Sequence, residues 1–145
     1  MRIVIDSNRV IASLIKDSTT REILFDNHFK FFTPSFIKTE ISKYKHEIIK
    51  KTGLDEDNFD KLFDVIFEHI AIIPNIEYEK YLDELSKEVK DKKDLPYFAA
   101  FLRINADGIW THDPHFQEQK RCRILTNIDL LKISGKSKNQ FTDSP

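Results

Sequence analysis

The chain has 145 residues, of which 40% are hydrophobic and 32% are charged, and its formal net charge is −1. This length suits one compact domain with a proper core, and the composition excludes a disordered chain or a membrane protein. The near-zero charge also argues mildly against a nucleic-acid-binding protein, since many of these carry a basic excess. Bound divalent cations or local clusters of Lys and Arg would supply positive charge without that excess.

The first residues, the apolar runs and the single cysteine indicate the cellular compartment that we expect. The opening residues, MRIVID, reach an acidic residue too early for a secretory signal peptide. No apolar run approaches the roughly 18 residues that a membrane span needs. The lone Cys122 cannot form an internal disulfide bond. We therefore expect a reduced, cytoplasmic setting and no contact with a membrane.

Short apolar runs alternate with segments of helical spacing along the chain. In chain order the pattern predicts a strand at 2–6, helices at 8–16 and 20–26, a strand at 29–33 stopped by Pro34, helices at 35–50 and 55–69, a strand at 70–73, helices at 77–89 and 94–105, strands at 108–111 and 123–125, and a helix at 127–133. This alternation predicts one α/β domain over residues 1–133, with a parallel sheet covered by helices on both faces. Residues 134–145, SGKSKNQFTDSP, are polar and patternless, and we expect a flexible C-terminal tail.

Two aspartates lie at the carboxyl ends of predicted strands. Asp6 ends the first strand, and Asp113 follows the fourth in the run IWTHDP. Ligands of open parallel sheets bind at the carboxyl ends of the strands, so both carboxylates are expected at one edge. Each also has an ordinary alternative, because Asp6 suits a helix N-cap and Asp113 suits a turn before Pro114.

Two further acids are expected at the same edge because of where they lie on helices. Asp94 opens a nearly all-apolar helix that leads straight into the fourth strand, so the start of that helix lies at the carboxyl edge; a simple helix cap is the alternative. Glu40 follows Ile37 by three residues and precedes Tyr44 by four, on or beside an apolar stripe. A carboxylate there is costly unless it is paired or bound to metal, and a solvated flank of the stripe is the alternative.

Four carboxylates at one edge would repel one another, and a divalent cation is the simplest remedy. Ligands that are all carboxylate oxygens suit Mg²⁺ or Mn²⁺ rather than zinc. Such a site polarises a phosphoryl oxygen and lowers the pKa of a bound water, which is the chemistry of phosphodiester hydrolysis. His112 and His115 flank Asp113, but without a Cys partner they are weak indicators of a transition-metal site.

Four stretches together resemble the motifs of the PIN-domain family, which includes VapC-like and PilT N-terminus-like ribonucleases. IVIDSN at 3–8 resembles its opening strand and acid, DKKDLPYFAA at 91–100 its third acidic motif, and ADGIWTHD at 106–113 its strand followed by Thr-x-Asp. KTEI at 38–41 resembles the helix that carries the second acid, and is the least specific of the four. The match spans about residues 2–133 in the family's order.

The resemblance implies a three-layer α/β/α sandwich with a five-stranded parallel sheet in the order 3-2-1-4-5. It implies an endonuclease that depends on Mg²⁺ or Mn²⁺ and usually cleaves RNA. Many such single-domain proteins of bacteria and archaea are toxins paired with a small antitoxin, and often form homodimers. Carried over by position, the catalytic metal ligands would be Asp6, Glu40, Asp94 and Asp113.

The resemblance also implies roles for neighbouring residues. Asn8 would orient Asp6 or touch the substrate, and Thr111 would form a hydrogen bond within the cluster. Arg9 stands where the family usually has an aliphatic residue, and is expected either to contact a substrate phosphate or to be solvated.

Two assignments at the third acidic motif stay open. Asp91 is close enough in sequence to replace Asp94 as a ligand, although Asp94 opens the more rigid helix. Lys93, next to Lys92, is expected either to hold RNA phosphates or to be an ordinary solvated lysine.

Two alternatives to a nuclease remain. The first is a catalytically silent PIN-like module that binds RNA or another protein. The second is a phosphatase with Asp6 as nucleophile, but such enzymes carry Asp-x-Asp, and Asn8 occupies the position of the second acid.

Overall fold

The computed structural model describes residues 1–135. At its centre lies a five-stranded sheet whose neighbouring strands are all parallel, in the order β3-β2-β1-β4-β5. The strands are β1 (Arg2–Ile5), β2 (Lys30–Pro34), β3 (Ile70–Ile73), β4 (Gly108–Trp110) and β5 (Ile124–Leu125). Both the predicted fold class and the predicted strand order are confirmed.

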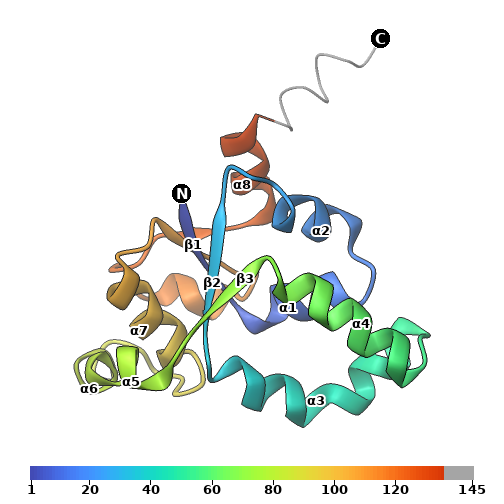
Figure 1. Cartoon of the computed structure of the whole chain (residues 1–145). Helices are drawn as coiled ribbons and strands as arrows, with labels where there is room; N and C mark the ends of the chain where they lie inside the picture. The colour runs from blue at the N-terminus through green and yellow to red at the C-terminus, as the bar shows by residue number, and fades with distance from the viewer. Residues whose placement is uncertain (136–145) are drawn as a thin grey trace.

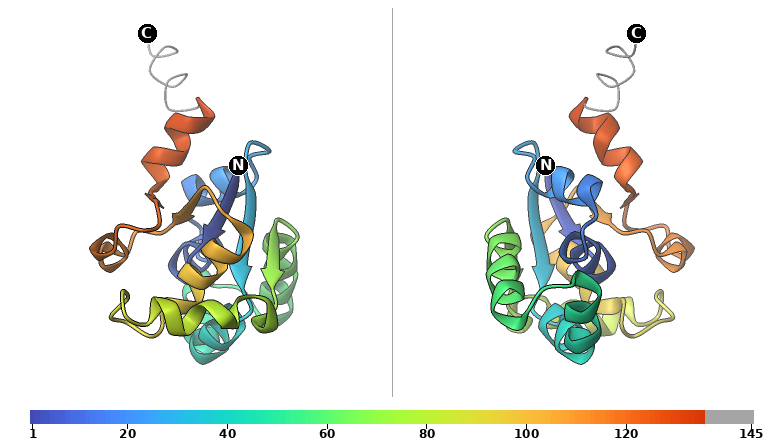
Figure 2. Two further views of the ribbon diagram at one scale, coloured as in Figure 1. Left: turned by 90° about the vertical axis from the view of Figure 1, so that its left-hand side faces the viewer. Right: turned by 90° about the vertical axis from the view of Figure 1, so that its right-hand side faces the viewer.

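Helices cover both faces of the sheet (Figures 1 and 2). The helices of one layer pack against one face of the sheet and form the first core with it. They are α1 (Ser7–Leu14), α2 (Ser18–Leu24), α3 (Ile37–Thr52), α4 (Glu56–Phe67) and α8 (Asn127–Ser134). The other layer contains α5 (Asn75–Tyr78), the 3₁₀ turn η1 (Glu79–Tyr81), α6 (Leu82–Leu85), α7 (Leu95–Ile104) and the 3₁₀ turn η2 (Pro114–Glu118).

The two cores follow from the alternation of side chains along each strand. Ile3 and Ile5 pack into the first core and Val4 into the second, and all three are fully buried. In β4, Ile109 belongs to the second core and Trp110 to the first. Burying a side chain of this size stabilises the fold by about 1.5–3 kcal/mol, so the central strands, apolar on both faces, anchor the domain.

The register of β1 and β4 determines which residues emerge side by side at the carboxyl edge. Ile5 pairs with Trp110, and the Asp6 amide donates to the Trp110 carbonyl at 3.0 Å. The residues after these strands, Asp6 and Thr111, therefore lie together. Helix α7 runs back into β4 through the left-handed Asn105, so its first residue returns to the same edge.

The single helix predicted over residues 77–89 is wrong. The segment instead forms α5, η1 and α6, with irregular backbone angles at Tyr78 and Tyr81. All three pieces contact α7, which is 10 residues long. The bends keep Tyr78 and Leu85 buried beside this short helix, which a straight helix of about 20 Å would overshoot. Packing has overridden a sound helical pattern.

Smaller differences concern element ends. Pro34, expected to stop the second strand, is its last residue and pairs with Ile73. Ser134 belongs to α8 and Gly135 is its left-handed cap, so only positions 136–145 of the predicted tail remain, and these lie outside the described residues. Within residues 1–135, no helix combines the length and apolar character that crossing a membrane requires.

The contact between β4 and β5 yields a stability prediction. A Cβ atom on Gly108 would lie 2.4 Å from Leu125 Cδ1, inside the van der Waals limit, and Leu125 is buried. Gly108→Ala should therefore lower the free energy of unfolding by about 1–3 kcal/mol in chemical denaturation. In a double-mutant cycle, Leu125→Ala should relieve part of that loss, because it removes the clashing atoms. Additive losses would contradict the clash.

Candidate active site

The hydroxyl group of Thr111 connects three of the predicted site residues. It donates a hydrogen bond to Asp6 Oδ2 at 2.7 Å. It accepts one from Asn8 Nδ2 at 3.3 Å and one from the Asp113 amide at 3.0 Å. A hydroxyl has one donor and two acceptor positions, so all three are used. Thr111 is buried, and it holds the loop after β4 against the end of β1.

Asp6 is the most deeply buried of the four acids, with 5% of its surface exposed. Its Oδ1 accepts from the Ser7 amide at 2.8 Å, so the helix-cap alternative also holds at this position. Burial raises the pKa of the carboxyl group to about 6, against the opposing effect of the hydrogen bonds from Thr111 and Ser7. The charges of the nearby Glu40 and Asp113 carboxylates are smaller contributors to this rise.

Glu40 lies in the first turn of α3, where it is half-buried. Burial raises its pKa, and hydrogen bonds from Tyr97 and Ser7 and the charge of Lys93 oppose that shift. The Tyr97 hydroxyl donates to Glu40 Oε1. Burial, and then the nearby Glu40 charge, raise the pKa of Tyr97 far above its usual range, so this hydroxyl remains a donor. Glu40 is thus a held carboxylate rather than a solvated flank.

Asp94 occupies the N-cap position of α7, but its side chain makes no capping hydrogen bond. The cap alternative therefore does not explain it. Burial raises the pKa of Asp94 to about 7, with smaller contributions from the charges of four other carboxylates: Asp91, Asp6, Asp113 and Glu40. Asp94 thus interacts electrostatically with all of the other predicted acids.

Asp91, the alternate ligand, differs from Asp94 in its surroundings. It is exposed, and its Oδ1 accepts from the Lys93 amide at 2.9 Å within the loop. Its charge acts on Asp94 and Glu40. Asp91 therefore borders the cluster, whereas Asp94 lies within it.

Asp113 caps η2 and binds a histidine. Its Oδ1 accepts from the His115 amide at 2.9 Å and lies 2.8 Å from His115 Nδ1. This hydrogen bond raises the pKa of His115. The turn before Pro114 that the sequence predicted as an alternative is therefore present as well, and it orients the carboxylate.

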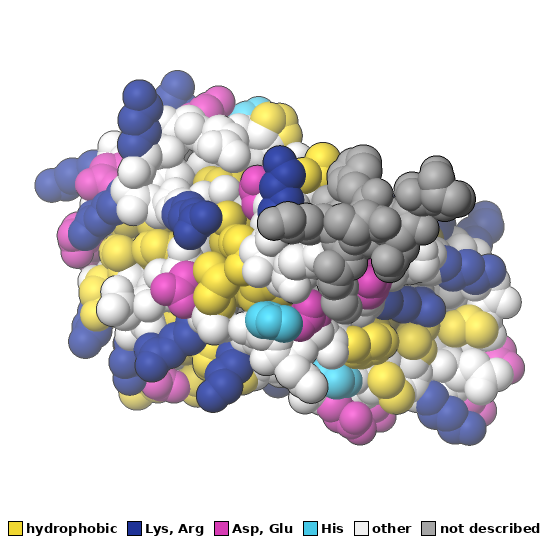
Figure 3. All heavy atoms as spheres, turned by 90° about the horizontal axis from the view of Figure 1, so that it is seen from above, with side chains coloured by type: hydrophobic (Ala, Val, Ile, Leu, Met, Phe, Trp, Pro, Cys, Tyr) yellow, Lys and Arg dark blue, Asp and Glu magenta, His cyan; other side chains and the backbone are white. Residues whose placement is uncertain are grey.

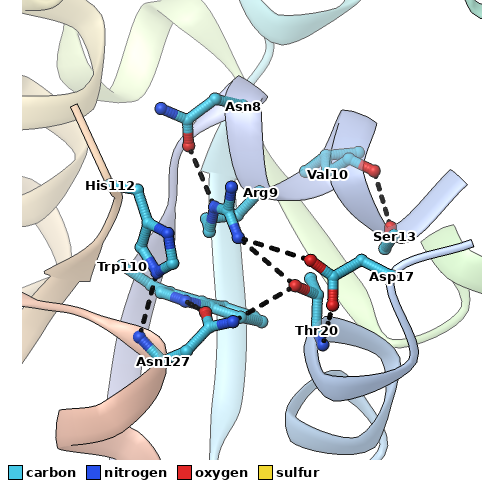
Figure 4. A network of polar contacts seen from close by, with 9 residues as sticks. All are labelled: Asn8, Arg9, Val10, Ser13, Asp17, Thr20, Trp110, His112 and Asn127. Atoms are coloured by element: carbon cyan, nitrogen blue, oxygen red, sulfur yellow. Dashed lines mark hydrogen bonds and ion pairs between the residues drawn. The ribbon is translucent and has the colours of Figure 1, made fainter. Parts of the chain in front are cut away.

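Arg9 is neither solvated nor free to reach outward, since only 13% of its side chain is exposed. Its Nε donates to Asn8 Oδ1 at 3.3 Å, and a terminal nitrogen donates to Thr20 Oγ at 3.3 Å and lies 4.0 Å from Asp17. Figure 4 shows the guanidinium between α1 and the start of α2. A chain of hydrogen bonds runs from Arg9 through Asn8 and Thr111 to Asp6.

The same network reaches α8 (Figure 4). Asn127 accepts from Trp110 Nε1 at 2.8 Å, donates to Thr20 at 3.4 Å, and its amide donates to His112 Nε2 at 3.1 Å. Burial, and then the Arg9 charge, lower the pKa of His112. The neutral His112 therefore serves as an acceptor that ties the loop after β4 to α8, rather than as a metal ligand.

The donor set suits a hard divalent cation, because every candidate ligand is a carboxylate oxygen and Asp6 and Asp94 carry raised pKa values. Within residues 1–135, no group of three or more His, Cys, Asp or Glu side chains already has the arrangement that a metal ion needs. Three of the carboxylates are held by protein donors, so ligation would exchange some of those contacts for the ion. The residues therefore fit a divalent metal in their chemistry.

Three residues that form hydrogen bonds with the site carboxylates were not predicted from the sequence. Tyr97 was assigned to an apolar helix, Ser7 to the strand motif, and His115 to a weak metal signal. A tyrosine three residues after Asp94 was a usable clue, since a buried phenol needs a hydrogen-bond partner.

Comparison with known proteins points to one family. The sequence model of one family, described as the PIN domain, matches residues 4–123. That stretch contains all four acids. A search of the curated proteins found no match.

The raised pKa of Asp94 yields a prediction about stability. Its pKa of about 7 in the fold exceeds the ordinary 3.8. The carboxyl group therefore contributes stability that is complete below the ordinary value and is lost as the pH rises through about 7. In EDTA at about pH 8, Asp94→Asn should raise the free energy of unfolding by about 1–2 kcal/mol, after a discount for partial exposure. The gain should shrink towards about pH 5.

The control is Asp64→Asn on α4, because Asp64 is exposed and far along the chain from the four acids. Its effect should not follow the pH in this way. Addition of Mn²⁺ should raise the melting temperature of the wild type more than that of Asp94→Asn. A destabilised Asp94→Asn at high pH would contradict the electrostatic account.

Proposed function

Because the chain belongs to the PIN-domain family, whose members are generally metal-dependent nucleases, we propose that it is an endoribonuclease that depends on Mg²⁺ or Mn²⁺. The observation that carries the proposal is the electrostatic coupling of Asp94 with Asp6, Asp113 and Glu40 at the carboxyl edge of the sheet. These residues come from four separate parts of the chain. Such a set of oxygens is suited to a divalent cation next to a phosphodiester.

In this proposal Asp6, Asp94 and Asp113 are metal ligands, together with Glu40. When bound, the ion would polarise a phosphoryl oxygen and lower the pKa of a water molecule. Glu40, whose pKa is raised by burial, is suited to accept a proton from that water. Tyr97 keeps the Glu40 carboxylate oriented by its hydrogen bond.

The neighbouring residues divide into positioning and substrate-binding groups. Thr111 and Asn8 position Asp6, and Arg9 positions Asn8 because its donors are directed into the protein. The substrate-phosphate contact that the sequence left open for Arg9 has less support, because only 13% of its side chain is exposed. Lys93 is exposed beside Glu40 and is suited to an RNA phosphate.

A phosphatase mechanism with Asp6 as nucleophile has less support. Both Asp6 oxygens accept hydrogen bonds and the residue is 5% exposed, which leaves little room for attack on phosphorus. The silent-module alternative is tested by calorimetry, since a protein that binds RNA but no Mn²⁺ would have lost the chemistry. A toxin role, with a small antitoxin as partner and a homodimer as the assembly, remains a prediction.

Removal of the Asp6 charge tests the proposed reaction. Asp6→Asn should abolish RNA cleavage in Mg²⁺ or Mn²⁺ while the protein stays folded, because a neutral amide is a poor ligand for these ions. Gel assays with labelled RNA measure cleavage, and circular dichroism checks the fold. Robust cleavage by the folded variant would overturn the assignment of the site.

Replacement of Thr111 tests the positioning of the carboxylates. Thr111→Val preserves shape but removes the hydroxyl group, and should lower metal affinity or activity by about 10- to 100-fold. Thr111→Ser should restore most of it. Thr33→Val is a matched control, because Thr33 is equally buried at the end of β2 and donates to the Ile5 carbonyl. Thr33→Val should lose about 1 kcal/mol of stability but keep the metal affinity. Equal losses of metal affinity in Thr111→Val and Thr33→Val would show that Thr111 has only a structural role.

A further inference from the structure

We propose that Lys43, Tyr44 and Lys93 form a nucleotide subsite that binds the segment of single-stranded RNA adjoining the cleaved phosphate. The inference rests on the proposed function and specifies its substrate class. The subsite lies where the first turns of α3 meet the loop before α7. Here a cavity of about 120 Å³ is lined by Phe36, Thr39, Glu40, Lys43, Tyr44 and Lys93.

The cavity adjoins the carboxylate cluster directly, because Glu40 belongs to both. One side of Glu40 faces the cavity, and its charge also acts on Asp6 and Asp94. The Lys93 charge reaches the Glu40 carboxylate. A strand with its scissile phosphate at the carboxylates therefore has a neighbouring nucleotide within reach of this cavity.

Its two lysines are available for phosphates. Lys43 and Lys93 are both exposed, and neither forms an ion pair with a carboxylate within 4.0 Å among residues 1–135. The i,i+4 pair of Lys43 with Glu47 that the sequence permits is not formed. Unpaired cations beside an acidic cluster complement the charge of an RNA backbone.

Tyr44 supplies an aromatic surface for a base. It is 40% exposed, although tyrosine in an amphipathic helix usually packs inward. The Lys43 ammonium lies 5.5 Å from the centre of its ring, so cation and aromatic surface occur together. Stacking on such a ring needs an unpaired base, which favours a single strand over a duplex.

The opposite flank of the carboxylates has the wrong charge for RNA. A larger cavity of about 530 Å³ borders Asp94, and acids outnumber bases in its lining: Glu88, Asp91, Asp94 and Glu118 against Lys90 and His115, with Val89, Phe98 and Gln119 uncharged. At the far end of the molecule, seen from above in Figure 3, Lys and Arg side chains are dispersed among acidic ones. Charge therefore directs the strand to the Lys43 side.

Binding of short single-stranded RNA, measured by fluorescence anisotropy in EDTA to prevent cleavage, tests the subsite. Lys43→Ala and Lys93→Ala should each weaken binding and reduce the salt slope by about 0.7, the value for one phosphate contact. Tyr44→Ala should weaken binding by roughly 5- to 100-fold without a change in slope, and Tyr44→Phe should restore it. A duplex of the same sequence should bind less tightly than the single strand.

Lys80→Ala is the matched control. The Lys80 ammonium lies 5.2 Å from the centre of the Tyr81 ring, a similar pairing that lines no cavity beside the carboxylates. It should bind RNA like the wild type. Unchanged binding in Lys43→Ala, Lys93→Ala and Tyr44→Ala would overturn the subsite, and so would absence of binding by the wild type. If the nuclease proposal alone is wrong, the binding pattern persists while Mn²⁺ produces no cleavage.

Discussion

The carboxyl ends of β1 and β4 are joined by one hydroxyl group, that of Thr111. It donates to Asp6 and accepts from Asn8 and from the Asp113 amide, so it orients acids from two strands at once. Because the group is buried and all its hydrogen-bonding positions are used, a shift in any partner would leave a polar atom unsatisfied, at a cost of about 1–3 kcal/mol. This cost makes the edge rigid.

Rigidity is needed because the acids oppose folding. Burial raises the pKa of Asp6 and of Asp94, and the negative charges of the neighbouring carboxylates contribute to both shifts. The opposing stability comes from apolar packing elsewhere, above all from the central strands and from α7, whose first six residues are all buried. Such a cluster of carboxylates destabilises the metal-free protein, and the same negative charge favours the binding of a cation.

The charge around the site is uneven, which the net charge of −1 conceals. One flank carries Lys43 and Lys93, and on the other acidic residues outnumber basic ones. A small net charge is therefore compatible with a local basic surface beside the four acids.

The sequence by itself determined the α/β class, nearly every strand and helix, and the placement of Asp6 and Asp113, because hydrophobic periodicity and strand-end position are local properties of the chain. The strand order came from a family resemblance and was confirmed. Tertiary structure alone decided that residues 77–89 bend around α7, that Asp94 is no ordinary cap, and that Tyr97 meets Glu40. It also decided that Arg9 turns inward. These features depend on contacts between distant segments, whose free energies exceed the local preferences that a sequence pattern records.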